Sequence, residues 1–161
     1  MLILQTTEKR PSQTLQVRLY FVVAVLCSGI AIGTLTSPGE WYAELNKPFF
    51  NPPNWVFGPV WTVLYVLIAV AGWRQFEARR KGSHFTLWCI QLGLNFLWSP
   101  AFFSLQNPWL AFIVIVALFL SILLFINRSW STDKISALIF VPYLAWVNFA
   151  TALNLSIAIL N

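Results

Sequence analysis

The feature that most constrains this chain is a series of five long apolar stretches that contain no Asp, Glu, Lys or Arg. These stretches are Leu19–Leu35, Trp55–Trp73, Phe85–Leu105, Trp109–Ile126 and Ile135–Leu160. Each is long enough to cross about 30 Å of hydrocarbon as a helix, and in lipid every backbone polar group must be paired internally. Because the short alternating strands of a barrel are absent from the sequence, we predict an all-α integral membrane protein, a five-transmembrane-helix bundle.

The composition supports one membrane domain. Charged residues make up 9% of the 161 residues, whereas soluble domains carry about 25%. We predict a polar N-terminal tail at residues 1–18 and a single membrane domain at residues 19–161. No clear small-residue cleavage pattern follows the first stretch, so we interpret it as a retained helix and not as a signal peptide. Pro100 and Pro142 lie inside stretches and predict local kinks.

The basic residues are distributed unequally between the two ends of the predicted bundle. With five spans, nine of the ten share the side of the N-terminal tail, and only Lys47 lies on the other side. Such an excess marks the cytoplasmic side of a bacterial inner membrane, so we predict a multi-pass protein of a bacterial cell membrane with its N-terminus in the cytoplasm; an outer mitochondrial membrane stays open as the alternative. The net charge of +5 is then explained by contact with the lipid bilayer, and we expect no nucleic-acid partner.

Few side chains offer catalytic or metal chemistry. Cys27 and Cys89 lie in separate apolar stretches without CxxC spacing and predict small buried side chains. His84 begins the third stretch, where an interfacial role and a role as haem ligand both stay open. We find no nucleophile–base pair, metal cluster or phosphate loop, so we predict no catalytic residues, no metal and no required cofactor. Gly29 and Gly33 form a GxxxG motif, which favours helix packing within the bundle or dimerisation.

Amide and aromatic side chains inside the apolar stretches are the strongest functional signal. At 100° per residue they gather on one face of each of three helices. These faces hold Trp61 and Tyr65; Trp88, Gln91, Asn95 and Trp98; and Tyr143, Trp146, Ala150 and Asn154. Counted from the first loop at about 1.5 Å per residue, they meet in the same half of the membrane. We predict a cavity for a large, flat, mostly apolar ligand; the alternative, that the amides only join helices, stays open.

The first loop contains the segment WYAELNKPFFNPPNW, residues 41–55. Pro48, Pro52 and Pro53 restrict its backbone and remove N–H donors that would need partners. Its aromatic side chains, which include Trp41, Tyr42 and Trp55, would then fold over the mouth of the cavity. We therefore predict a lid, with a rigid interfacial connector as the alternative.

Three segments together identify a family resemblance. WYAELNKPFFNPPNWVFGPVWTVLY, QLGLNFLWSPAFF and VPYLAWVNFATALN resemble, in order and spacing, the TspO/MBR family of tryptophan-rich sensory proteins, which are related to the mitochondrial translocator protein. The resemblance implies a five-helix bundle, commonly a homodimer, that binds protoporphyrin IX, haem and similar drug-like ligands. It assigns the lid to Trp41, Tyr42 and Pro48, and the pocket to Trp61, Gln91, Asn95, Trp98, Trp146, Ala150 and Asn154.

The resemblance leaves three functional hypotheses. The first is a receptor or carrier for tetrapyrroles with a role in tetrapyrrole regulation or stress sensing. The second is an enzyme-like activity, the light-dependent breakdown of porphyrin with Trp61 or Trp146 as redox-active side chains. The third is a structural protein whose predicted cavity is packed core.

Two positions depart from the family pattern. The family often has Trp at the position of Phe50. No Tyr followed by Lys or Arg comes after Asn154, so we expect no specific cholesterol binding by that route.

Overall fold

The structure, a computed structural model, describes residues 11–36, 38–77 and 83–161, and every regular element in these ranges is helical. In chain order the elements are α1 (Pro11–Leu35), α2 (Glu40–Glu44), the 3-10 helix η1 (Asn54–Val56), α3 (Phe57–Glu77), α4 (Ser83–Ser99), the π-helix η2 (Pro100–Ser104), α5 (Pro108–Trp130) and α6 (Lys134–Leu160). The predicted all-α class is confirmed. α1 begins at Pro11, inside the residues predicted as a polar tail; residues 1–10 lie outside the described ranges.

Four helical segments in the described part of the chain are long and apolar enough to cross a membrane. They are Leu15–Leu35, Asn54–Glu77, Pro108–Trp130 and Lys134–Leu160, and each contains or overlaps one predicted stretch. The remaining predicted stretch, Phe85–Leu105, is divided between the 17 residues of α4 and the five residues of η2. The short helix α2 in the first loop was not predicted. The helical membrane class is therefore confirmed, and the count of five spans is not.

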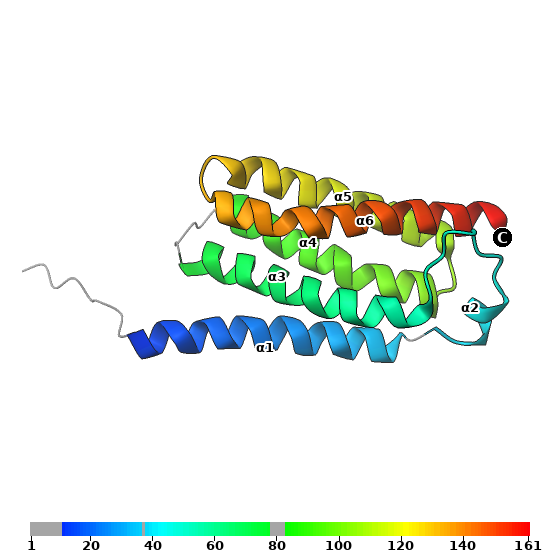
Figure 1. Ribbon diagram of the computed structural model, residues 1–161, viewed down its shortest axis with the longest axis horizontal. Coiled ribbons are helices and arrows are strands. Elements are labelled where there is room, and N and C mark those ends of the chain that lie inside the picture. Colours follow the sequence, from blue (N-terminus) through cyan, green and yellow to red (C-terminus); the bar gives the residue numbers. More distant parts are fainter. Residues whose placement is uncertain (1–10, 37, 78–82) are drawn as a thin grey trace, which may run out of the picture.

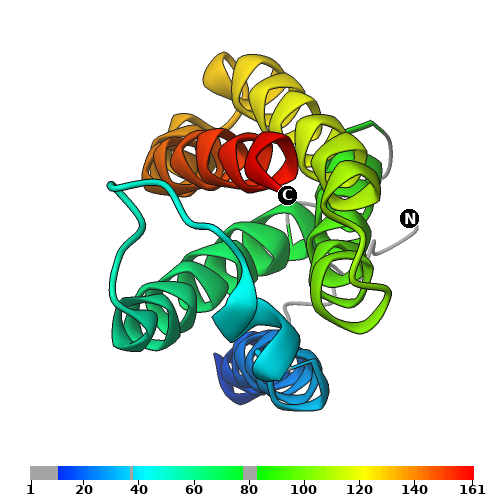
Figure 2. The same ribbon diagram turned by 90° about the vertical axis from the view of Figure 1, so that its right-hand side faces the viewer.

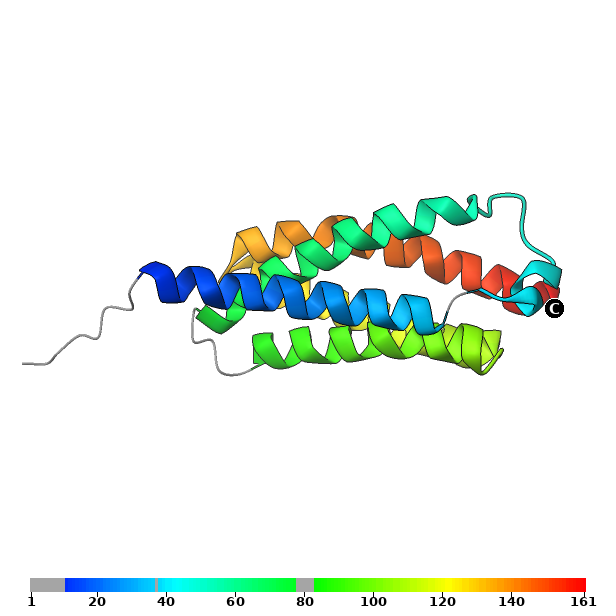
Figure 3. The same ribbon diagram turned by 90° about the horizontal axis from the view of Figure 1, so that it is seen from below.

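The long helices run side by side, and α2 with the first loop lies at the end of the bundle where α1 ends (Figure 1). Seen along their length, they form a ring in the order α1, α3, α6, α5, α4 (Figure 2). α5 and α6 pack closely, whereas α1 packs chiefly along α3 and makes little contact with α4. Figure 3 shows that the end of α3 nearest the first loop stands apart from the end of α1.

The densest part of the core joins α3, α5 and α6. Phe125 and Phe140 are fully buried, and their ring centroids lie 4.3 Å apart. Ile68 and Ile122 are fully buried as well and belong to the same cluster. On the outside, Ile113 and other large apolar side chains are exposed, as expected of helices whose outer surface contacts lipid instead of water.

The two prolines inside the predicted stretches behave differently. At Pro100, α4 passes into η2, where the N–H of Leu105 donates to the Pro100 carbonyl at 2.9 Å. This i to i+5 bond is the mark of a π-helical turn, one of the usual ways in which a helix accommodates a local irregularity. Pro142 instead lies inside the continuous helix α6.

A carboxylate joins α3 to α6 at the end of the bundle opposite the first loop. Asp133 accepts hydrogen bonds from Arg74 Nη2 at 2.8 Å, Gln75 Nε2 at 3.2 Å and Ser136 Oγ at 2.8 Å. It also caps α6 by accepting from the backbone N–H of Ser136. Burial raises the pKa of Asp133, but the hydrogen bonds from Arg74 and Ser136 and the charge of Arg74 outweigh it, so the net pKa lies below the ordinary 3.8.

A glycine allows α3 and α4 to approach each other closely. A Cβ atom built on Gly72 would lie 2.3 Å from the indole of Trp88, a distance that no side chain could tolerate. That indole is held in place because its Nε1 donates to the carbonyl of Ile68 at 2.8 Å. The Trp88 ring thus packs directly against the backbone of α3.

Candidate functional site

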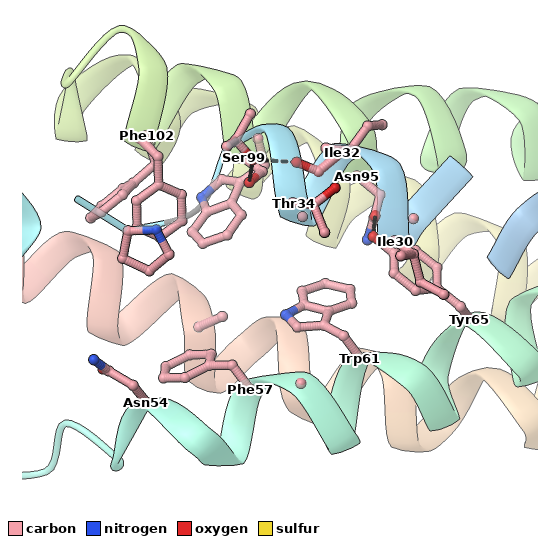
Figure 4. A pocket seen from close by; sticks show the side chains of 18 of the residues that line it. Ile30, Ile32, Thr34, Asn54, Phe57, Trp61, Tyr65, Asn95, Ser99 and Phe102 are labelled. Carbon is pink, nitrogen blue, oxygen red and sulfur yellow. Dashed lines mark hydrogen bonds between the residues drawn. The ribbon is translucent and has the colours of Figure 1, made fainter. Parts of the chain in front are cut away.

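A cavity of about 400 Å³ lies between α1, α3, α4, η2 and α6, on the side of the first loop. In Figure 4, Phe57 and Trp61 project into it from α3, opposite Asn95 and Ser99 of α4. Its wall also contains Ile30 of α1. None of the lining residues in the described part of the chain carries a charge.

The predicted ligand-binding residues number eleven: Trp41 and Tyr42 of the first loop and the members of the three polar faces other than Trp88. Seven of them line this cavity. They are Tyr42, Trp61, Tyr65, Asn95, Trp98, Ala150 and Asn154. They come from the first loop, α3, α4 and α6, as the convergence of the three polar faces predicts. The other four, Trp41, Gln91, Tyr143 and Trp146, do not line it.

A chain of three hydrogen-bonded side chains forms the floor of the cavity. Tyr65 Oη donates to Asn95 Oδ1 at 3.0 Å, and Asn95 Nδ2 donates to Tyr143 Oη at 2.8 Å. Trp61 lies over this floor, with its ring centroid 5.6 Å from that of Tyr65. Both the oxygen and the nitrogen of the Asn95 amide form hydrogen bonds, so this amide joins three helices. It also holds in place the ring of Tyr65, which lines the cavity.

A second amide supports the wall nearer the loop. Trp98 Nε1 donates to Asn154 Oδ1 at 2.9 Å, and Asn154 Nδ2 donates to the Pro108 carbonyl at 2.8 Å. The Trp98 ring stacks on Phe102, with centroids 5.5 Å apart. The indole therefore presents a fixed face, which is the geometry that aromatic stacking on a flat ligand requires.

The predicted residues outside the cavity miss it for different reasons. Gln91 is fully buried, and its Nε2 donates to the Trp88 carbonyl of its own helix at 2.8 Å. Trp146 packs on Phe57 at 5.9 Å, and its buried Nε1 has no hydrogen-bond partner among the described residues. The floor at Asn95 separates Gln91 from the cavity, whereas Trp146 lies on the first-loop side of Tyr143 and packs against the lining residue Phe57 from outside the cavity. Trp41 packs behind the wall, 5.7 Å from Phe102.

The first loop is fastened across the end of the bundle. Tyr42 is buried and packs on Phe103, with ring centroids 5.4 Å apart. The backbone N–H of Asn46 donates to Asn161 Oδ1 at 2.9 Å, and Asn161 Nδ2 returns a bond to the Asn46 carbonyl at 3.1 Å. Tyr42, together with Pro38 and Asn54, reaches the cavity wall.

The proline positions of the predicted lid stay on the outer side of the loop. The residues Pro48, Pro52, Pro53 and Trp55 do not line the cavity. Trp55 is 74% exposed. Of the predicted lid residues, Tyr42 is therefore the one that lines the cavity, and the prolines shape the backbone that carries it.

Sequence reasoning missed the wall that α1 supplies. Leu26, Ile32 and Thr34 line the cavity from this helix, and Thr36 lines it from the turn that follows. The Thr36 hydroxyl forms a short hydrogen bond with that of Ser99 on α4. α1 contains no amide or indole in its apolar stretch, so it gave no polar signal. The GxxxG motif was the only local indication that this helix approaches others.

The structure answers the prediction for the two cysteines and locates His84. Cys27 and Cys89 are exposed, so the prediction that they are buried is wrong; both lie on outer helix faces of the bundle. His84 lies far from the cavity, with its Nε2 3.1 Å from the Arg128 carbonyl at the opposite end. Among the described residues, no group of three or more His, Cys, Asp or Glu could hold a metal ion.

Comparison with known proteins agrees with the architecture. The model of the TspO/MBR family matches residues 21–160. The chain is 45% identical to the Tryptophan-rich protein TspO of Archaeoglobus fulgidus over 148 residues, which are 87% of this chain and 94% of the relative. It is 40% identical to Protein CrtK of Rhodobacter capsulatus, covering 88% and 90% of the two chains. It is 31% identical to the human Translocator protein, covering 78% and 79%. The chain therefore belongs to the TspO/MBR family.

Proposed function

We propose that this chain is a five-span membrane receptor or carrier that binds tetrapyrroles in the cavity beneath the first loop. α1, α3, α5 and α6 supply four of the spans. α4 and η2 together contain 22 residues, 17 in the helix and five in the π-turn, which suffices for the fifth. Arg74, Arg128 and Lys134 lie at the end opposite Lys47, so we place that end in the cytoplasm.

The observation that carries the proposal is the chemistry of the cavity wall. Ligand sites are typically concave, mostly apolar and between about 300 and 1,000 Å³ in volume, and the cavity of about 400 Å³ falls within this range. The rings of Trp61, Trp98 and Phe57 face it, and the uncharged wall favours a ligand whose enclosed part is neutral. The tetrapyrrole class itself rests on the family resemblance.

Protoporphyrin IX titration of the purified protein in detergent tests this proposal. Porphyrin close to Trp61 and Trp98 should quench tryptophan fluorescence saturably. Ala150 lines the cavity, so Ala150→Leu should weaken binding about tenfold, because overfilling a packed site costs about 1–3 kcal/mol.

Ala152→Leu is the matched control. Ala152 is exposed on the same helix and does not line the cavity, so this variant should bind like the wild type. Quenching that rises linearly without saturation, or an equal loss of affinity in both variants, would contradict binding in this cavity.

A further inference from the structure

α1 and α3 touch closely at one level of the bundle. A Cβ atom built on Gly29 would lie 2.3 Å from the ring of Tyr65, so the glycine is what lets the two helices meet there. This contact seals the lower part of the interface between them. Tyr65 is in turn held by its bond to Asn95.

Above this contact, towards the first loop, the same two faces no longer meet. Gly33 lies one turn beyond Gly29, and Gly58 lies two turns before Tyr65, so both point towards the interface. A Cβ atom at either glycine would find no heavy atom within 4 Å. The separation of the two helix ends is visible in Figure 3.

Residues beside this gap line the cavity and are exposed at the same time. Ile30, a lining residue of α1, is 58% exposed, and Thr34 and Thr62 are also both lining and exposed. The cavity therefore opens sideways between α1 and α3. At a rise of about 1.5 Å per residue, the opening spans roughly 10 Å at the end of α1 and at the start of α3, the parts of both helices nearest the first loop.

The border of the opening is compatible with hydrocarbon. The Thr34 hydroxyl donates to the Ala31 carbonyl and the Thr62 hydroxyl to the Gly58 carbonyl, each at 2.9 Å within its own helix. Hydroxyl groups satisfied in this way need no water. Both sides of the opening belong to segments long and apolar enough to cross a membrane.

The route under the first loop, by contrast, is closed by specific contacts. A ligand that entered from the water above would have to break the reciprocal bonds between Asn46 and Asn161 and displace the packed ring of Tyr42. Among the described residues, no hydrogen bond joins α1 to α3 across the side route.

We infer that the cavity exchanges its ligand directly with the hydrocarbon of the membrane through the opening between Gly33 and Gly58. The inference rests on the proposed function and adds the source of the ligand. The ligand is a flat molecule that is dissolved in the membrane and not one captured from water. The loop closes the top of the cavity and does not act as the gate.

The test compares rates of exchange in lipid vesicles that contain the protein and protoporphyrin IX, followed by stopped-flow tryptophan quenching. Gly33→Leu and Gly58→Leu place side chains in the opening, and each has room for the new atoms. Both association and dissociation should slow about tenfold, with a much smaller change in the dissociation constant, because an obstacle on the path raises the barrier in both directions.

Gly93→Leu is the matched control, since a Cβ at Gly93 also meets nothing within 4 Å and this residue of α4 does not line the cavity. It should leave both rates unchanged. Asn161→Ala, which removes the bonds that fasten the loop, should leave them unchanged as well.

The outcomes separate the two proposals. Saturable quenching with wild-type rates in both Gly33→Leu and Gly58→Leu overturns the side entrance and leaves the proposed function standing. Faster exchange in Asn161→Ala also overturns it, because the ligand then passes under the loop. Absence of saturable quenching in the wild type overturns the proposed function and this inference together. Because the two glycines lie on different helices, misfolding of one variant leaves the other to decide.

Discussion

The carboxylate of Asp133, which joins α3 to α6 at the end of the bundle opposite the first loop, gives a quantitative prediction. Asp133→Asn removes the charge and keeps the shape and one acceptor oxygen, so the cap on α6 can persist. The Asp133 side chain is only 6% exposed and that of Arg74 is 29% exposed. Removing one partner of a buried ion pair costs about 3–5 kcal/mol. Because Arg74 retains some access to water, we expect a loss at or just below the lower limit of that range, about 2–3 kcal/mol in the free energy of unfolding.

The dependence on pH follows from the direction of the pKa shift. The pKa of Asp133 is lower in the folded protein than the ordinary value of 3.8. Its contribution to stability is therefore fully present above that ordinary value and is lost as the pH falls through the lower folded pKa. The stability difference between wild type and Asp133→Asn should be constant from pH 7 to about pH 5 and shrink below about pH 4.

Unfolding in mixed detergent micelles, followed by circular dichroism, measures this difference. Glu44→Gln removes a negative charge from an exposed position on α2 and should leave stability unchanged. A double-mutant cycle with Arg74→Gln isolates the pair, and its coupling energy should be between about 1 and 3 kcal/mol. A loss below about 0.5 kcal/mol, or independent effects of the two substitutions, would refute the reasoning, since such values are typical of exposed pairs.

Three further substitutions, of which Gly93→Ala is a comparison for Gly72→Ala, test the helix contacts. Gly72→Ala should lower the free energy of unfolding by about 1–3 kcal/mol, because its Cβ meets the fixed ring of Trp88. Gly93→Ala, with open space around it, should raise stability by up to about 1 kcal/mol through helix propensity; effects of the same sign would contradict this account. Asn154→Leu should cost about 2–4 kcal/mol, because it leaves Trp98 Nε1 and the Pro108 carbonyl without their partner. A shift in tryptophan emission should accompany that loss.

The sequence predicted the helix faces well because two simple rules govern them. Long charge-free stretches must become helices in lipid, and the 100° spacing places Asn95 and Trp98 on one side of the third stretch. The structure brings both to the cavity, together with Trp61 and Ala150. These placements need no knowledge of how the helices cross.

The depth of the cavity could not be predicted in the same way. Gln91 lies on a predicted face, but the floor between Tyr65, Asn95 and Tyr143 leaves it below the cavity. Trp146 is nearer the first loop than that floor and packs on Phe57 outside the cavity instead. The position of that floor depends on where α3, α4 and α6 approach each other, which rotational spacing does not encode. The exposure of Cys27 was missed for a related reason: a helix that is apolar all round does not reveal which side faces its neighbours.

The absence of charge from the five apolar stretches has an electrical consequence. A membrane potential of 100 mV does about 2.3 kcal/mol of work on each elementary charge carried across the bilayer. Helix movements confined to these stretches carry no formal charge, so the potential can neither drive nor oppose them. Exchange of a neutral ligand through the opening between α1 and α3 should thus proceed equally in energised and de-energised membranes, and its net flow would follow its own concentration gradient.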